Sequence, residues 1–222
     1  MFIAKIPGKL NNDRLLGVIE RLRKNERWIG RNFSAGNLSN MEIFQKRIKD
    51  DPSFETALIE RQADFSDMAL GKSNLAISGC EVIAVYNLLQ SYSGRDFAVS
   101  LPTLIEIFEK DGILRAGHFG VSPQAIAEYL KGIGLPINYT TDITDFDVLG
   151  YYCDHFILTV LNDREDIFKQ IHTFYISKEN NNFISHNAGL RMRYHSISEI
   201  IGAIPSGRAK GLCLIGLKEP VE

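Results

Sequence analysis

The segment from Cys80 to Gln90 restricts the fold more than any other part of the chain. Its sequence, CEVIAVYNLLQ, is apolar on almost every side when it is wound as a helix. A surface helix keeps a polar face toward water, whereas a helix that is apolar all round lies in a core. We therefore predict a central buried helix that the rest of the chain surrounds.

The residues after this helix predict further helices followed by strands. Amphipathic helices are expected over 102–110 and 122–131, and a last short helix over 196–201. Strands are predicted over 137–140, 156–161, 172–177, 183–186 and 212–217. The Asn-rich stretch 178–182 predicts a hairpin turn between the third and fourth strands. Helices in one half and a mostly antiparallel sheet in the other indicate an α+β fold.

The first part of the chain is richer in charge and predicts helices only. Apolar residues recur at helical spacing after Asn12, a second helix is expected to begin with Asn40 as its cap, and a third short helix is expected over 53–60. No catalytic motif falls here. We predict two units: an N-terminal helical segment, residues 1–72, which is either a cap or a pro-region, and a second domain, residues 73–222.

Charge and cysteine content narrow the function classes. The chain has 222 residues and a net charge of −2, so no overall field favours nucleic acid or an anionic membrane. The basic cluster Arg21–Lys24 is predicted to be a solvated face. The N-terminus is too short for a signal peptide, and no apolar run is long enough for a transmembrane helix. Three cysteines without metal-type spacing indicate reduced thiols, which favours a cytoplasmic protein. The oligomeric state stays open.

Cys80 is the candidate nucleophile because it stands where the buried helix should begin. The dipole and the unpaired N–H groups at a helix start lower the pKa of a thiol. Gly79 permits a tight turn, and the Cys80 N–H can donate to an oxyanion. Asn74, 80 − 74 = 6 residues upstream, is the candidate for the second donor. Gln62 is too far upstream to take this place by local geometry.

His172 and Asn187 are the predicted partners of this cysteine. His172 opens one predicted strand and Asn187 follows the next, so an antiparallel hairpin brings the two residues side by side. Because side chains alternate along a strand, only one of His186 and Asn187 can meet His172. We predict that Asn187 meets it and orients the imidazole, as the third group of a catalytic triad does.

His155 is the alternative base. It opens an apolar strand, but its partner would have to be Asn162 or Gln170, and neither can fold back beside it through a simple hairpin. His118 and His195 lie in predicted loops and are expected at the surface. The sequence therefore favours His172 without excluding His155.

Four features of this chain follow the order seen in papain-like cysteine peptidases. They are an amide residue (Asn74), a helix that starts with Gly79-Cys80, a strand that starts with His172, and Asn187 after the next strand. The chain resembles this superfamily over residues 74–217, and is similar in look to its bacterial branch that cleaves double-glycine leader peptides. The family's usual amide is Gln, so Asn74 is a departure. The resemblance implies a papain-like fold with the central helix packed on the sheet. It also implies a cysteine hydrolase of peptide or amide bonds that uses Cys80, His172 and Asn187, with Asn74 at the oxyanion.

Two other functions use the same fold. One is a catalytically silent papain-like binding module, and the other is an acyltransferase or deamidase with the same three residues. A metal site at Cys153, Asp154 and His155 has poor spacing for a closed site, so we predict no metal or cofactor. The expected partner is a peptide or amide substrate, and neither nucleic acid nor a membrane.

Overall fold

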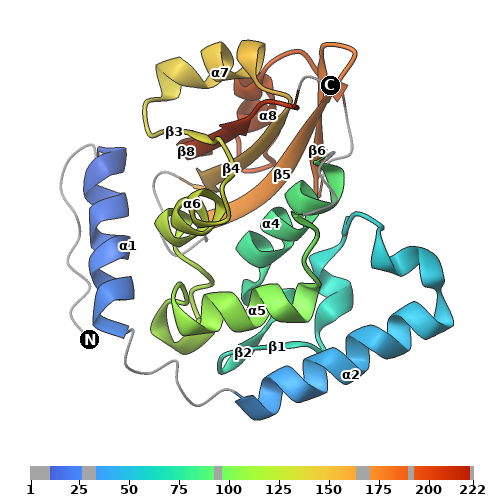
Figure 1. Ribbon diagram of the computed structural model, residues 1–222. Helices are drawn as coiled ribbons and strands as arrows, with labels where there is room; N and C mark the ends of the chain where they lie inside the picture. The colour runs from blue at the N-terminus through green and yellow to red at the C-terminus, as the bar shows by residue number, and fades with distance from the viewer. Residues whose placement is uncertain (1–10, 27–33, 93–96, 164–170, 190–192, 221–222) are drawn as a thin grey trace.

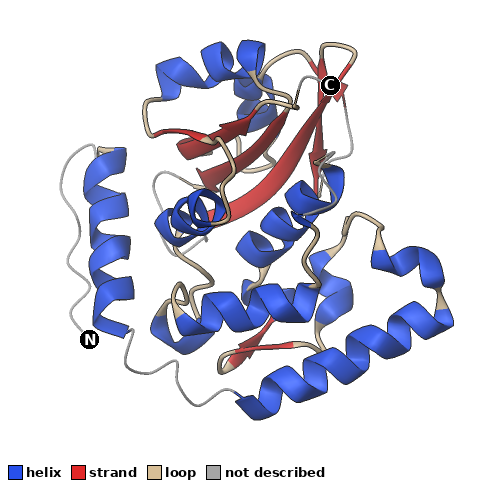
Figure 2. Ribbon diagram, viewed as in Figure 1, coloured by secondary structure: helices blue, strands red, loops and turns tan. Residues whose placement is uncertain are grey.

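The computed structural model describes residues 11–26, 34–92, 97–163, 171–189 and 193–220. Its centre is a six-stranded sheet in the order β3-β8-β4-β5-β6-β7, in which every neighbouring pair is antiparallel. Helices cover both faces of this sheet (Figures 1 and 2). The predicted α+β class is confirmed.

The strands lie close to their predicted positions. They are β3 (Asn138–Thr140), β4 (His155–Leu161), β5 (Ile171–Glu179), β6 (Asn182–His186), β7 (Arg193–Tyr194) and β8 (Lys210–Leu217). Only the two-residue β7 was not predicted. The hairpin between β5 and β6 turns at Asn180 and Asn181, whose φ values of 50° and 62° lie in the left-handed region that Asn tolerates.

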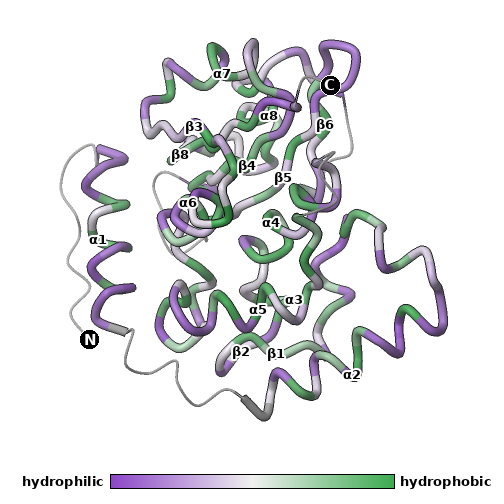
Figure 3. The backbone as a smooth tube through the Cα atoms, viewed as in Figure 1, coloured by the Kyte–Doolittle hydropathy of each residue, from purple (hydrophilic) through white to green (hydrophobic). Residues whose placement is uncertain are grey.

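The central helix is α4 (Cys80–Ser91), and its burial confirms the main prediction from the sequence. Val82, Ile83 and Val85 are completely buried. The helix packs on β5 and β4, where residues such as Ile157 and Tyr175 share its core cluster. Figure 3 shows apolar residues along α4 and along the strands behind it. Burial of this helix fixes Cys80, its first residue, against the sheet.

A second core fills the opposite face of the sheet. Phe156, Leu158 and Phe174 pack there with residues of α7 (Phe146–Tyr152) and α8 (Ile197–Ala203). The helix α8 was predicted, and the Ser196 hydroxyl caps it by accepting a hydrogen bond from the Glu199 N–H. The helix α7 was not predicted. The sheet is therefore covered on both sides, as its continuous apolar strands require.

The remaining elements precede the sheet in the chain, except η6, which follows β3. They are α1 (Asn12–Glu26), α2 (Ser34–Asp50), η2 (Pro52–Glu55), η3 (Gln62–Phe65), β1 (Ala69–Leu70), β2 (Ser73–Asn74), α3 (Leu75–Ser78), α5 (Leu101–Lys110), η5 (Arg115–Gly117), α6 (Pro123–Gly132) and η6 (Ile143–Asp145). Figure 1 shows α1 and α2 at the outside of the molecule, with α5 between α2 and the central helix.

Three local predictions for the first part of the chain were wrong. The helix α2 begins six residues before Asn40, whose side chain instead bonds the backbone N and O of Ala69 at 2.7 and 2.9 Å. In place of the third helix, predicted over 53–60, the chain forms only the 3-10 turn η2, and the next turn, η3, begins after the predicted range. Arg23, expected on a solvated face, is 2% exposed and paired with Glu20 and Glu128 at 2.7 and 2.8 Å. The errors at Asn40 and Arg23 reflect contacts distant in sequence.

The N-terminal segment contributes side chains to the same core as the central helix. Phe44, Ile59, Phe65 and Met68 belong to the cluster that contains the α4 residues. The short strands β1 and β2 also pair across the predicted boundary after residue 72. Within the described ranges, no helix combines the length and hydropathy needed to cross a membrane.

Candidate active site

Cys80 is the first residue of α4, directly after the N-cap residue Gly79. The preceding short helix α3 ends at Ser78, so the chain turns sharply between two helices at Gly79. A Cβ atom on Gly79 would lie 2.4 Å from Leu75 Cδ2 and 2.7 Å from Leu75 Cα. Only glycine fits at this turn, which explains the Gly-Cys pair that the sequence displays.

The Cys80 thiol is enclosed between the sheet and its own helix. The residue is 7% exposed, and its sulfur contacts the backbone of Thr173 and the carboxyl group of Glu81. Burial raises the pKa of the thiol well above its ordinary value, the negative charge of Glu81 raises it further, and the hydrogen bond to the Thr173 backbone opposes both. We expected the helix start to lower this pKa, but desolvation outweighs the dipole.

His172 directly precedes Thr173, whose backbone contacts the Cys80 sulfur, on β5. The strand β6 pairs with β5 only from Tyr175 onward, so the part of β5 that contains His172 has no partner on the β6 side within the described residues. The His172 Nε2 atom lies 2.9 Å from the backbone carbonyl oxygen of Asn187. Burial lowers the pKa of His172, and the bond to Asn187 partly opposes this. Among the described residues, no hydrogen bond joins the Cys80 sulfur to the imidazole.

Asn187 meets His172 through its main chain and not through the predicted side-chain amide. Its side-chain oxygen Oδ1 accepts a hydrogen bond of 2.9 Å from the Gln62 N–H, and its Nδ2 lies 3.4 Å from Gln62 Oε1. Its φ of 59° is left-handed, a conformation that Asn adopts more readily than most residues. This turn directs the carbonyl toward His172 and the amide toward Gln62.

Gln62 was set aside on sequence grounds because it lies so far from Cys80 along the chain. Folding returns it to the site, since η3 packs against α3, which ends just before Cys80. Its Nε2 donates to the Ala76 carbonyl oxygen at 3.1 Å. Spacing along the chain contains no signal for this contact, because it depends on tertiary packing alone.

Asn74, the predicted second oxyanion donor, caps α3. Its Oδ1 accepts a hydrogen bond of 3.1 Å from the Ile77 N–H, as N-cap side chains do. The oxygen is therefore committed to the helix, and the amide nitrogen is the group that could serve an oxyanion. That role stays a prediction.

His186, next to Asn187, anchors the end of β6. Its Nδ1 lies 2.8 Å from Glu60 Oε1 and its Nε2 lies 3.0 Å from Ser177 Oγ. Its ring stacks on Tyr175 with centroids 5.2 Å apart. These contacts tie the segment before η3 to the sheet beside Asn187.

His155, the alternative base, lies at the other end of the central helix. Its Nδ1 lies 2.6 Å from the Tyr175 hydroxyl, its Nε2 bonds Glu219, and Tyr92 meets its ring edge-on at 5.8 Å. Tyr92 directly follows α4, which has 12 residues and so spans about 18 Å. Cys80 begins that helix and His155 adjoins its end. Gln170, one possible partner of His155, lies outside the described residues.

Cys153 and Cys213 lie in buried surroundings that are typical of structural cysteines. Cys153 and Cys213 are each 1% exposed, and burial raises the pKa of both thiols, that of Cys213 to about 11. Cys213 lies in β8, as its apolar setting predicted. In the described part of the chain, no group of three or more His, Cys, Asp or Glu side chains is arranged to hold a metal ion.

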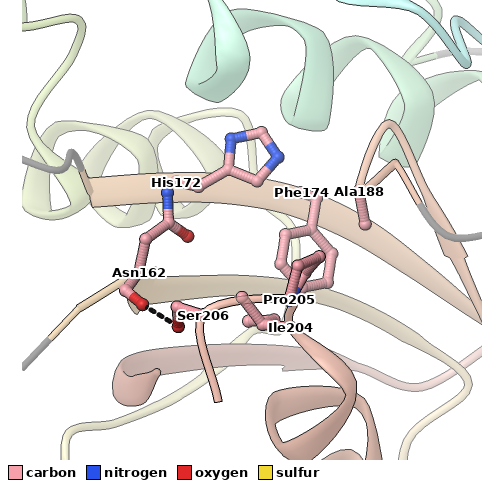
Figure 4. Close-up of a pocket in the computed structure, with 7 residues that line it drawn as sticks. All are labelled: Asn162, His172, Phe174, Ala188, Ile204, Pro205 and Ser206. Carbon is pink, nitrogen blue, oxygen red and sulfur yellow. Dashed lines mark hydrogen bonds between the residues drawn. The ribbon is translucent and has the colours of Figure 1, made fainter. Parts of the chain in front are cut away.

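A pocket of about 300 Å³ opens beside His172. Its other lining residues carry no charge: Asn162, Phe174, Ala188, Ile204, Pro205 and Ser206. Figure 4 shows the imidazole at the edge of this pocket, with Asn162 on one side and Ala188 on the other. The Ser206 hydroxyl donates a hydrogen bond to the Asn162 carbonyl oxygen, which closes one wall.

Comparison with known proteins finds one similar structure to report. No protein-family model matches the chain, and no curated protein matches it. The crystal structure of the peptidase domain of Streptococcus ComA, a bi-functional ABC transporter involved in a quorum-sensing pathway, matches with 15% sequence identity and a TM-score of 0.42. The match covers 64% of this chain and 91% of that domain. The contacts of Cys80 and His172 described above stand independently of this likeness.

Proposed function

We propose that this protein is a cysteine hydrolase of peptide or amide bonds, with Cys80 as nucleophile and His172 as base. Asn187 orients the imidazole through its backbone carbonyl. The observation that carries the proposal is the contact of the Cys80 sulfur with the backbone of Thr173, the residue next to His172. This contact, with the His172 Nε2 atom already bonded to the Asn187 carbonyl, supports the pairing of a thiol at a helix start with an imidazole base.

The tautomer of His172 supports this assignment. A neutral imidazole that donates from Nε2 to the Asn187 carbonyl has Nδ1 as its acceptor. The Cys80 proton would move to Nδ1 while the sulfur bonds the substrate carbonyl carbon. The imidazolium would then return the proton to the leaving amine, and water would hydrolyse the thioester to a carboxylic acid and the free thiol. The N–H of Cys80 and the amide of Asn74 are the proposed oxyanion donors.

Alkylation by iodoacetamide at neutral pH tests the proposal. We expect faster labelling of Cys80 than of Cys153 or Cys213, and we expect His172→Asn to slow it. Mass spectrometry of proteolytic fragments measures each site in one sample. Equal and slow labelling of all three cysteines would remove Cys80 from the role of nucleophile.

The electrostatics favour a second candidate function, a papain-like binding module without turnover. Burial keeps both Cys80 as a thiol and His172 as a neutral ring, so the resting site lacks a reactive ion pair. A module would bind a peptide and leave it intact. Binding without cleavage, measured by calorimetry with mass analysis of the same sample, would favour it. Acyl transfer or deamidation would use the same residues and appear as a product other than the hydrolysed peptide.

A further inference from the structure

Glu81 is a buried carboxyl group immediately after the nucleophile. The residue is 3% exposed. Its carboxyl contacts the Cys80 thiol and the backbone N–H of Val121, and its Oε2 atom is buried without any hydrogen-bond partner. A buried carboxyl with an unsatisfied oxygen is costly to the fold, which makes its place beside a reactive thiol informative.

The chain leaves room for this carboxyl at Gly120. A Cβ atom on Gly120 would lie 2.5 Å from Glu81 Oε2 and 3.0 Å from the Ser78 carbonyl oxygen. Gly120 also has a left-handed φ of 69°. The loop after η5 therefore closes over Glu81 through a glycine that no larger residue can replace without displacing the carboxyl.

No cation neutralises Glu81 within the described residues. On the neighbouring η5 loop the charged and titratable groups are Arg115 and His118, both exposed, and α3 has none. On the other elements that pack around α4 these groups are His155, Glu106, Glu109, Lys110, Glu128, Tyr129, Lys131, His172, Tyr175, Lys178 and Glu179. Among all of these groups and Cys80, only Cys80 has an interaction with the Glu81 carboxyl. Among these described groups, the charge of Glu81 acts on the Cys80 thiol.

We propose that Glu81 is a positioning residue that holds Cys80 in its thiol form and releases it for proton transfer to His172 when the carboxyl is neutral. The inference rests on the proposed role of Cys80 as nucleophile. Ionised, Glu81 accepts the S–H hydrogen bond, and its charge opposes a second negative charge on sulfur. Protonated, it no longer opposes the thiolate and can donate to it. Ionisation of the Cys80 thiol is thereby opposed by the next residue of the same helix.

Glu81 ionises in a pH range where its charge can control the ionisation of Cys80. Burial raises the pKa of Glu81 to about 7, against an ordinary value of 4.5. The carboxyl therefore changes charge near neutral pH, and its charge raises the pKa of Cys80. Small changes in its surroundings, such as entry of a substrate, would shift the balance.

Titration of the thiol tests this inference without requiring any hydrolysis. Thiolate absorbance in the ultraviolet would be followed with pH for the wild type and for Glu81→Gln, each corrected by its own Cys80→Ser version. We expect Glu81→Gln to lower the apparent pKa of Cys80, and a pKa lower by one raises the thiolate fraction at neutral pH roughly tenfold, which speeds alkylation of Cys80. The matched control is Glu109→Gln. Glu109 is also 3% exposed with an unpaired Oε2, but it bonds the Gly71 N–H at 2.6 Å, and we expect it to leave Cys80 unchanged.

Two results would overturn the inference. An unchanged Cys80 titration in Glu81→Gln would show that the carboxyl does not act on the thiol. A higher pKa would show that the carboxylate helps to remove the proton. Circular dichroism would reveal whether Glu81→Gln folds. If it does not, the thiolate titration of the wild type decides the question. The inference then requires a second step near the ionisation of Glu81, and a single step would contradict it. Absence of peptide cleavage in all variants would count against the proposed function and not against this coupling.

Discussion

The Nε2 atom of His172 lies 2.9 Å from the backbone carbonyl oxygen of Asn187, while the side chain of Asn187 bonds Gln62 instead. A carbonyl can only accept a hydrogen bond, so this contact places the proton of the neutral ring on Nε2. Nδ1 is then the nitrogen available to the thiol proton. In the proposed mechanism, a main-chain group thus takes the orienting role that the papain-like resemblance assigned to a side chain.

This relationship predicts that Asn187 can lose its side chain and keep its function. Asn187→Gly preserves the left-handed φ and the carbonyl, so we expect Cys80 alkylation to stay within about threefold of wild type. The lost bonds to Gln62 should lower the free energy of unfolding by about 1–2 kcal/mol. Urea unfolding measures the second effect.

The matched variant is Asn187→Val, because a β-branched residue is strained at a φ of 59°. It should cost about 1–3 kcal/mol more than glycine and move the carbonyl, which slows alkylation. If Asn187→Gly is as slow as Asn187→Val, the side-chain amide matters after all.

A second prediction separates the two candidate bases. His172→Asn should reduce peptide hydrolysis by about 100-fold or more, the usual loss for a general base. His155→Asn should change the rate by less than about threefold, because His155 bonds Tyr175 and Glu219 at the far end of α4. Steady-state kinetics on one peptide substrate measures both. A larger loss for His155→Asn than for His172→Asn would reverse the assignment.

The sequence predicted the elements that depend on local pattern. The apolar surroundings of Cys80, the alternation in β5 and the Asn-rich hairpin each indicate structure within a few residues, and each was confirmed. The same reasoning failed for Gln62 and Arg23, which gain their partners by packing against distant segments. Spacing along the chain has no information about such contacts.

In the candidate site, too, local pattern predicted some features and tertiary packing determined the others. The helix start at Cys80 and the neighbourhood of His172 and Asn187 followed from strand order and hairpin geometry. Which atom of Asn187 faces the ring depends on one backbone dihedral angle, and the pKa of Cys80 depends on burial against the sheet. Neither quantity can be obtained from residue types alone, so the pKa of the Cys80 thiol was expected to be lower than it is.

A third prediction concerns the N-terminal segment. A chain that begins at Ser73 should not fold, because Phe44, Ile59, Phe65 and Met68 belong to the core around α4. Phe65→Ala in the full chain, a smaller test, should lower the free energy of unfolding by about 3–5 kcal/mol. Circular dichroism and urea unfolding measure both changes. A truncated chain that folds and cleaves faster than the full chain would identify the segment as a pro-region.

A fourth prediction follows from the burial of Glu81 and concerns stability. The pKa of Glu81 is raised from 4.5 to about 7, so between these values the folded chain binds more protons than the unfolded chain. Stability therefore falls as pH rises through this window, by about 3 kcal/mol at most from this group. Glu81→Gln removes that slope. The free energy of unfolding, measured at several pH values, should rise for the variant relative to the wild type from pH 4.5 to about 7. Above that pH the difference between the two should stay constant. A constant difference would indicate that Glu81 does not titrate in this range.

The pocket beside His172 leads to a prediction about substrate selectivity. The imidazole that takes the thiol proton must return it to the leaving amine, so the leaving part of a substrate has to lie next to the ring. The pocket borders the His172 ring, and Phe174, Ala188 and Ile204 line it without any charge beyond His172. An apolar side chain following the cleaved bond would be buried there, whereas a carboxylate would lose its hydration without gaining a partner.

We therefore expect kcat/KM to be roughly 10- to 100-fold higher for a peptide with leucine after the cleaved bond than for its glutamate counterpart, from about 1.5–3 kcal/mol of burial. Ala188→Phe should fill the pocket and remove most of this preference while leaving the rate of Cys80 alkylation unchanged. Ile143→Phe is the control, since Ile143 is already 50% exposed and does not line the pocket. Equal rates for the two peptides in the wild type would mean that the leaving group binds elsewhere, because an uncharged pocket cannot accept both side chains equally well.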